Sequence, residues 1–135
     1  LSAQAAGPNH PITSDIALGV HTQGDPDKIY QVITNLLANA RAHTPAGTHI
    51  HVATYSTAEG SYVTVADKGP GLSKADQLHI FERFYRVDSS RHRNSNDGSG
   101  LGLSIVEEVM KAHGGTVSVA SEPGDGATFT LHFKA

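Results

Sequence analysis

Two asparagines, Asn35 and Asn39, lie four residues apart in a segment with the apolar spacing of a helix. Side chains at that spacing share one helix face, so the two amides would point the same way. The carbonyl oxygen of Asn39 could bind a magnesium ion, a hard cation that prefers oxygen ligands and otherwise keeps its waters. The alternative is that both asparagines simply lie on a solvated helix face.

A carboxylate, Asp67, ends a β-rich run and is followed by a turn that contains Gly69 and Gly71. A carboxylate at this position could accept a hydrogen bond from an exocyclic amine, such as the amine of adenine. Glycines lack a side chain and would let the backbone approach a flat ring. An aspartate before a glycine turn is also common in ordinary hairpins, so this motif gains meaning only together with others.

Residues 81–85 hold three aromatic side chains and precede a polar stretch over residues 86–100 that is rich in Ser, Arg, Asn and Gly. A long stretch without apolar periodicity is typical of disorder or of a working lid. The aromatic residues could fill the core, or they could hinge such a lid. In the second case Arg86 or Arg91 would be able to reach a triphosphate.

A glycine-rich run, in which Gly98, Gly100 and Gly102 alternate with Ser99 and Leu101, opens a predicted helix. The first turn of a helix presents unpaired amides and a positive dipole end, and glycines let phosphate oxygens reach those amides. No Gly-Lys-Ser or Gly-Lys-Thr follows, which excludes a Walker loop. The run comes late and opens no strand-helix-strand unit, which disfavours a dinucleotide fold.

Composition narrows the class of protein. The chain has 135 residues, which is one domain by length, and a net charge of -3, which removes the electrostatic argument for nucleic acid or an anionic membrane as the partner. It has no cysteine, which excludes disulfides and thiolate metal sites, and no apolar run of about 20 residues. Because the chain opens with Leu1 rather than Met, we expect a piece of a longer protein that could be membrane-anchored.

The elements that must position these residues are read from local patterns. Asp25 can cap a helix whose first position suits Pro26, and apolar residues then recur at spacings of three and four until about His43. The whole pattern predicts an α+β two-layer sandwich, with a mixed, mostly antiparallel sheet and helices on one face. We expect a connector over residues 1–24, with short strands around Ile12 and over 20–23, and one domain over 25–135. Within it we expect helices over 25–43, 73–85 and 101–113 and strands over 48–57, 61–67, 116–121 and 127–133.

Taken together, in this order and spacing, the four motifs resemble the asparagine box, first glycine box, phenylalanine box and second glycine box of bacterial sensor histidine kinases. The resemblance covers residues 24–135. That family belongs to the wider ATP-binding group of gyrase and the Hsp90 chaperones, which has the Bergerat fold, an α/β sandwich. The resemblance implies that the chain binds ATP and Mg²⁺ and transfers the γ-phosphate to a histidine.

The resemblance also implies a role for each motif residue. Asn39 would ligate Mg²⁺, and Asn35 would support the metal or the phosphates. Asp67 would bind the adenine amine, in a pocket shaped by Gly69 and Gly71.

The remaining motif residues would act on the phosphates or on the lid over residues 86–100. Arg86 would reach the γ-phosphate. Phe81 and Phe84 would anchor the lid, and the phosphates would be held by Gly98, Gly100, Leu101 and Gly102.

Two departures from the pattern of relatives affect the chemistry. Four positions before the magnesium-binding asparagine, the ATPase relatives have a glutamate that activates water, whereas this chain has Asn35. An amide is a poor general base, so the site looks suited to transfer rather than to hydrolysis. Three positions after that asparagine, many relatives have a phosphate-contacting lysine; here Ala42 stands there, and Arg41 or His43 could substitute.

None of the nine histidines has the setting of a phosphoacceptor, which is a dimerising helical hairpin with an acidic residue following the histidine. We therefore expect the chain to act on a separate dimerisation and phosphoacceptor domain of the same kinase, and to meet the response regulator only indirectly. The chain alone would be monomeric, as the cytoplasmic domain of a membrane-anchored homodimeric parent. Alternatives are an autonomous ATPase of the gyrase or Hsp90 type, an anti-sigma serine kinase, and a binding module that has lost catalysis.

Overall fold

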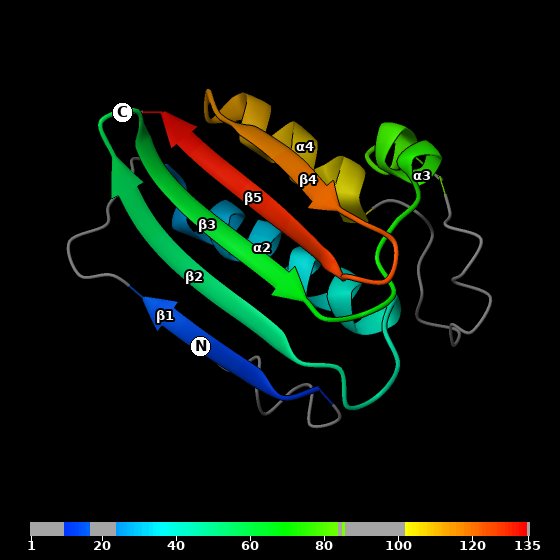
Figure 1. Ribbon diagram of the computed structural model, residues 1–135. Coiled ribbons are helices and arrows are strands. Elements are labelled where there is room, and N and C mark those ends of the chain that lie inside the picture. Colours follow the sequence, from blue (N-terminus) through cyan, green and yellow to red (C-terminus); the bar gives the residue numbers. More distant parts are fainter. Residues whose placement is uncertain (1–9, 17–23, 84, 86–101, 135) are drawn as a thin grey trace.

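The centre of the molecule is a sheet of five strands in the order β1-β2-β3-β5-β4 (Figure 1). The structure is a computed structural model that describes residues 10–16, 24–83, 85 and 102–134. β1 runs parallel to β2, and the other neighbouring strands pair antiparallel. The predicted mixed, mostly antiparallel sheet is therefore confirmed. Its strands are β1 (Ile12–Ile16), β2 (Ile50–Thr57), β3 (Gly60–Asp67), β4 (Thr116–Ser121) and β5 (Ala127–Lys134).

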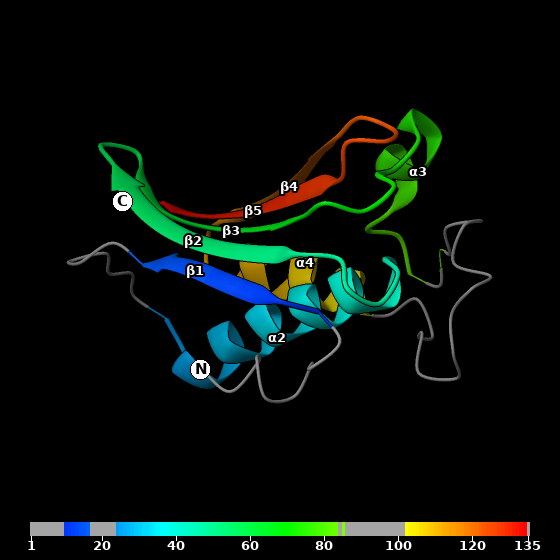
Figure 2. The same ribbon diagram turned by 60° about the horizontal axis from the view of Figure 1, so that its bottom comes forward.

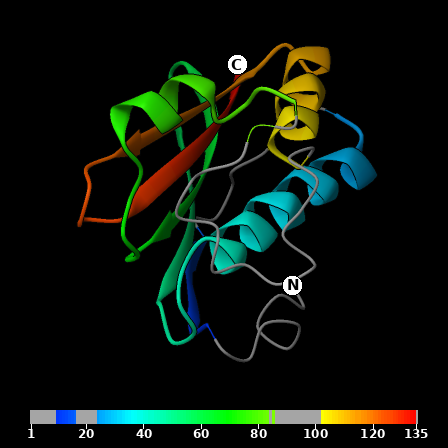
Figure 3. The same cartoon turned by 90° about the vertical axis from the view of Figure 1, so that its right-hand side faces the viewer.

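Two long helices, α2 (Pro26–Ala42) and α4 (Gly102–Ala112), cover one face of this sheet (Figures 2 and 3). α2 begins where the sequence predicts, because the Asp25 side chain accepts a hydrogen bond from the backbone N–H of Asp27 and Pro26 occupies the first turn. The two-layer α+β sandwich is confirmed. The buried stripe of α2 consists of Val32, Leu36, Leu37 and Ala40.

The alternation of side chains along the strands directs the core toward those helices. In β3, Val63 and Val65 are buried, and β5 lies beside it with Val65 opposite Phe129 and Val63 opposite Leu131. The two layers therefore meet in a dry core of aliphatic and aromatic side chains.

The opposite face of the sheet carries polar and aromatic residues. The ring of Tyr62 on β3 stacks between the rings of Tyr55 on β2 and His132 on β5, with ring centroids 4.7 Å and 4.3 Å apart. His132 also hydrogen-bonds to the backbone carbonyl of Glu59 through Nε2 at 3.0 Å. Cross-strand contacts of this kind stabilise a sheet face that neither α2 nor α4 covers.

The short helix α3 (Lys74–His79) ends earlier than the predicted helix over residues 73–85. After it, the N–H of Glu82 bonds to the carbonyl of His79, which is a turn rather than a continued helix. Ile80 is buried and Phe81 packs against the core. Neighbouring side chains in a continuous helix point about 100° apart, so the turn allows both residues to reach the core.

α3 also lies apart from the face that the other two helices cover, next to the end of β4 (Figures 1 and 2). Its Gln77 donates a hydrogen bond from Nε2 to the carbonyl of Ser121 at 3.1 Å. The prediction of helices on one face therefore holds for α2 and α4 only. The predicted strand over residues 20–23 lies outside the described residues. In the part of the chain that the structure describes, no helix is long and apolar enough to cross a membrane.

Candidate functional site

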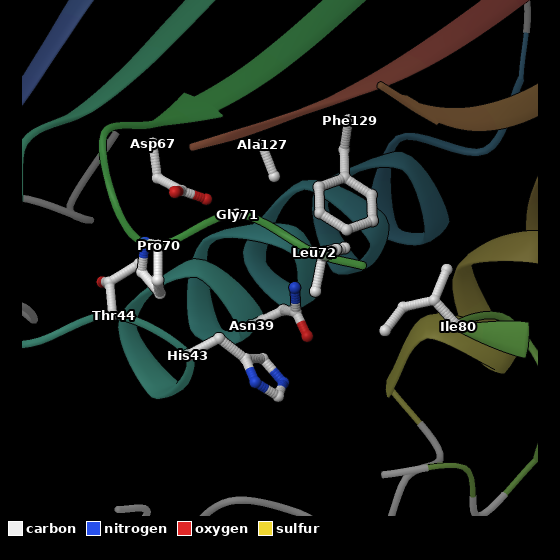
Figure 4. Close-up of a pocket in the computed structure, with 10 residues that line it drawn as sticks. All are labelled: Asn39, His43, Thr44, Asp67, Pro70, Gly71, Leu72, Ile80, Ala127 and Phe129. Atoms are coloured by element: carbon white, nitrogen blue, oxygen red, sulfur yellow. The ribbon is translucent and has the colours of Figure 1, made fainter. Parts of the chain in front are cut away.

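A recess opens between the C-terminal end of α2 and the sheet, where β3 ends and β5 begins (Figure 4). It includes about 300 Å³ of space, part of which is open solvent. Polar groups come from the helix side and from the sheet side, whereas the middle is apolar. The lining residues are Asn39, His43, Thr44, Asp67, Pro70, Gly71, Leu72, Ile80, Ala127 and Phe129.

Asp67, the last residue of β3, supplies the carboxylate on the sheet side of the recess. One of its oxygens, Oδ1, accepts a hydrogen bond of 2.9 Å from the N–H of Gly69. Burial raises the pKa of the Asp67 carboxyl above its ordinary value, while backbone hydrogen bonds from Gly69 and Ala127 and the charges of His43 and His10 act in the opposite direction. The result is a partly desolvated acceptor held in a fixed orientation.

Asn39 and His43 lie one helical turn apart on α2 and supply the polar groups on the helix side of the recess (Figure 4). Asn35, a further turn toward the N-terminus, is partly buried, and it is not among the lining residues. The predicted pair of asparagines is thus split, with only the second at the recess.

The polar groups of the recess provide few ligands for a metal ion, and magnesium requires few. No three His, Cys, Asp or Glu side chains gather into a metal site within the described residues. Mg²⁺ keeps several waters and takes other ligands from substrate phosphates, so it needs only one or two protein oxygens. The amide oxygen of Asn39 at the recess fits that requirement.

The two glycines after Asp67 are required by packing. A Cβ at Gly69 would collide with the methyl group of Thr44. Gly71 has a φ of +78°, and a Cβ there would lie 2.5 Å from the carbonyl oxygen of Glu122. The sequence predicts that both glycines let the backbone approach a flat ring. In the structure each glycine also lets the turn pack closely against its neighbours.

Residues 24–135 match the family described as histidine kinase-, DNA gyrase B- and HSP90-like ATPase. The chain belongs to this family. The match spans every element except β1 and includes all the residues that line the recess.

Individual relatives narrow the comparison within this ATPase family. The chain is 41% identical over 120 residues to the sensor-like histidine kinase SenX3 of Mycolicibacterium smegmatis. The aligned region covers 89% of this chain and 31% of SenX3. It superposes on the mycobacterial sensor histidine kinase MprB with a TM-score of 0.80 and 27% identity, over 98% of this chain and 88% of that one. A full-length ShkA structure in complex with AMPPNP gives a TM-score of 0.79 at 26% identity, over 98% of this chain and 29% of that one. The chain therefore spans less than a third of SenX3.

Only some residues of the aromatic and glycine-rich motifs are among those that the structure describes. Phe81 lies edge-on to Phe129, with ring centroids 6.1 Å apart, so it packs behind a residue of the recess and does not line it. Gly102 begins α4, and none of the described residues has an atom within 4 Å of where a Cβ would stand. The other predicted site residues, Phe84, Arg86, Gly98, Gly100 and Leu101, lie outside the described residues.

Sequence reasoning missed the apolar walls of the recess and one polar neighbour. Leu72, Ile80, Ala127 and Phe129 line the recess, and so does Thr44, directly after the helix that carries Asn39. A signal was present for two of them, because Ala127 and Phe129 alternate along the last strand and so share a face. Nothing local pointed from that strand to Asp67, since this placement depends on the pairing of β3 with β5.

Proposed function

We propose that this chain is the ATP-binding catalytic domain of a sensor histidine kinase, which holds ATP so that its γ-phosphate passes to a histidine on a separate dimerisation domain. The observation that carries the proposal is the meeting of Asp67 and Asn39 at one recess, from opposite layers of the fold. These two groups suit the two ends of ATP. The partly desolvated carboxylate of Asp67 would meet the base, and the amide oxygen of Asn39 would meet the metal ion at the phosphates.

Asp67 recognises adenine. Its ionised carboxylate accepts a hydrogen bond from the exocyclic amine, and the apolar residues Leu72, Ile80 and Phe129 contact the flat ring. Guanine has an oxygen where adenine has that amine, and an oxygen facing a carboxylate would be repelled. The AMPPNP named with the ShkA structure supports a nucleotide as the ligand of this fold.

Asn39 holds magnesium through its amide oxygen. The ion, when bound, neutralises charge on the phosphates during transfer. Asn35 supplies no carboxylate at the position where ATPase relatives activate water, and an amide cannot accept the proton of an attacking water efficiently. The chain therefore favours transfer to an imidazole nitrogen, with positioning and charge neutralisation as its contributions.

The other assignments complete this proposal. His43 contributes to nucleotide binding beside Asn39, Gly69 and Gly71 shape the pocket, and Arg86 meets the γ-phosphate. The phosphates lie on Gly98, Gly100, Leu101 and Gly102, and Phe81 and Phe84 anchor the lid. Residues 25–135 form the catalytic domain and residues 1–24 connect it to the dimerisation domain of a membrane-attached kinase, on the cytoplasmic side. The names of the relatives, which are sensor kinases, support this arrangement.

The test is a calorimetric titration of ATP, with and without Mg²⁺, into the wild-type chain and Asn39→Ala, together with an assay for phosphate release. Asn39→Asp, which keeps an oxygen ligand, is the matched control. We expect binding that Mg²⁺ strengthens in wild type and in Asn39→Asp, little strengthening in Asn39→Ala, and negligible hydrolysis. Rapid phosphate release by wild type would instead make the chain an autonomous ATPase, and absence of binding would contradict both readings.

A further inference from the structure

A buried histidine from the start of the described chain is bonded to the rim of the recess. His10 is 6% exposed, and its Nε2 lies 2.9 Å from the Thr44 hydroxyl oxygen and 3.4 Å from the Thr44 carbonyl oxygen. The Thr44 hydroxyl donates its own proton to the carbonyl of Ala40 at 2.7 Å. Both Thr44 oxygens must therefore accept from His10, so Nε2 carries the proton.

The position of His10 is fixed by strand pairing. The carbonyl of the next residue, Pro11, accepts a hydrogen bond from the N–H of Ile50, which extends the pairing of β1 with β2. The start of β1 lies at the same end of the sheet as the end of β3 and the end of α2 (Figures 1 and 2). His10 is thus held beside the recess by the fold and not only by its own hydrogen bond.

Thr44 links His10 to Asp67 through its contact with Gly69. Its methyl group lies against Gly69, so closely that no Cβ could stand on Gly69. The N–H of Gly69 in turn donates to Oδ1 of Asp67 at 2.9 Å. The hydroxyl face of Thr44 is therefore held by His10, and its methyl face supports the peptide that orients the carboxylate.

We propose that His10 is a positioning residue for the recognition of the base amine by Asp67, acting through Thr44 and Gly69. This inference rests on the proposed binding of ATP at the recess. Without the imidazole, the buried Thr44 hydroxyl oxygen loses its donor, and the Thr44 side chain is held only by its own bond to the Ala40 carbonyl. The turn at Gly69 then gains freedom, and the orientation of the Asp67 carboxylate becomes less well defined. The segment before β1 thus contributes to adenine preference, although it lies outside the family's matched region.

The experiment compares two nucleotides that differ only at the base amine: ATP and purine riboside triphosphate, which has a hydrogen in its place. Calorimetric affinities are measured for wild type, His10→Ala, His10→Gln and His10→Asn. The amide nitrogen of Gln is as many bonds from Cα as Nε2 of His, whereas that of Asn is one bond short. We expect His10→Ala and His10→Asn to lose about threefold to tenfold in affinity for ATP and little for the analogue, and His10→Gln to recover most of the preference.

Two Thr44 variants separate the links of the path. Thr44→Val keeps a methyl group against Gly69 but removes the hydroxyl acceptor of His10, which leaves only the longer contact with the backbone carbonyl. Thr44→Ser keeps the hydroxyl acceptor but removes the methyl group. Both should reduce the preference for ATP over the analogue. His113→Ala is the control, because His113 bonds to the opposite end of the same helix, where the N–H of Asp25 donates to its Nε2 at 3.1 Å. It should leave the preference unchanged.

The outcomes distinguish this inference from the proposed function. If wild type binds neither nucleotide, the proposed function fails and the inference fails with it. If wild type prefers ATP and His10→Ala keeps the whole preference, or loses affinity equally for both nucleotides, only the inference is overturned. Should His10→Ala fail to fold in a thermal unfolding control, the contrast between His10→Gln and His10→Asn decides: equal preferences in these two variants would overturn the inference.

Discussion

The two ends of helix α2 each meet a histidine, and the two contacts are opposite in sense. At the N-terminal end, the N–H of Asp25 donates to Nε2 of His113, whose Nδ1 bonds to the carbonyl of Val109 at 2.9 Å. At the C-terminal end, Nε2 of His10 donates to Thr44. A helix presents free N–H groups at its start and free carbonyl groups at its end. The histidine at the start therefore accepts through an unprotonated Nε2, and the histidine at the end donates through a protonated Nε2.

The difference between the two ends of α2 separates contacts that stabilise the fold from contacts that lie at the recess. Asp25 and His113 are far from the recess and join α2 to α4, so their contact is architectural. The C-terminal end instead gathers several buried or partly buried polar groups around the recess, including Asn39, Thr44 and the Asp67 carboxylate. We expect changes at the N-terminal end to lower stability alone, and changes at the C-terminal end to alter nucleotide binding with or without a loss of stability.

The largest expected effect comes from Asp67→Asn, which keeps the shape and the acceptor for Gly69 but removes the charge. Affinity for ATP should fall by about tenfold to a hundredfold, because a hydrogen bond to a charged group contributes about 1.5–3 kcal/mol. The melting temperature should not fall, because partial burial disfavours the charged carboxylate. Calorimetry and thermal unfolding of the same preparations measure both quantities. A lower melting temperature with equal loss for purine riboside triphosphate would place Asp67 with the architectural residues.

The preference for ATP should also depend on pH. Burial raises the pKa of Asp67, and the ionised carboxylate is a stronger acceptor for the adenine amine than the protonated carboxyl group. Preference for ATP over purine riboside triphosphate should therefore decline as pH falls through this raised pKa, by up to about tenfold per unit. Titration of the phosphates is common to both nucleotides and cancels in the ratio.

The same shift has an opposite consequence for the empty protein. Because the folded state binds the Asp67 proton more tightly than the unfolded state does, its contribution to stability is fully present below the unfolded pKa and is lost as pH rises through the folded pKa. Asp67→Asn should abolish this contribution as well as the pH dependence of the preference. A preference that stays pH-dependent in Asp67→Asn would assign the effect to another group.

A matched pair of glycine variants sharpens the comparison at both ends of α2. A Cβ on Gly24 would collide with the His113 ring, and a Cβ on Gly69 would collide with the Thr44 methyl group. Gly24→Ala and Gly69→Ala should each lower the free energy of unfolding by about 1–3 kcal/mol, the usual range for overpacking. Denaturant titration measures this loss. Only Gly69→Ala should weaken ATP binding, and equal effects of both variants on ATP would remove the distinction between the two ends.

The smallest expected effect is that of His113→Ala on stability. The variant leaves the Asp25 N–H to solvent and removes the hydrogen bond to Val109, with an expected loss of about 1 kcal/mol in the free energy of unfolding. Affinity for ATP should remain within about twofold of wild type, since an exchange of one exposed contact for water changes little at a distance. A large loss of nucleotide binding would show that the N-terminal end also serves the site.

The sequence predicted what local signals control. α2 was predicted from Asp25, Pro26 and the apolar spacing that follows, and all three act within a few residues of one another. The carboxylate of Asp67 was predicted as a binding group because it stands directly before a glycine turn. The carboxylate lies at the recess, in agreement with that prediction. Its role in binding adenine stays a prediction.

What the sequence could not show depends on contacts between distant segments. His10 and Thr44 are 34 residues apart, and their hydrogen bond exists only because β1 pairs with β2. α3 ends early because Ile80 and Phe81 both turn to a core that later strands complete. No periodic pattern in the sequence could distinguish the buried His10 from the other histidines.

The parallel pairing of β1 with β2 also sets an order for folding. Ile12 lies opposite Ile50, so β1 can pair only after α2 and the start of β2 are available, whereas β2 and β3 form a hairpin between neighbours in sequence. Contacts between segments far apart in sequence close long loops and form slowly. We expect β1 to dock after the hairpin of β2 and β3 has formed, although β1 is synthesised before it, and His10 arrives with β1. In a folding chain, Asp67 would then reach its place at the end of β3 before His10 docks. Full discrimination between purines would develop only after His10 has docked.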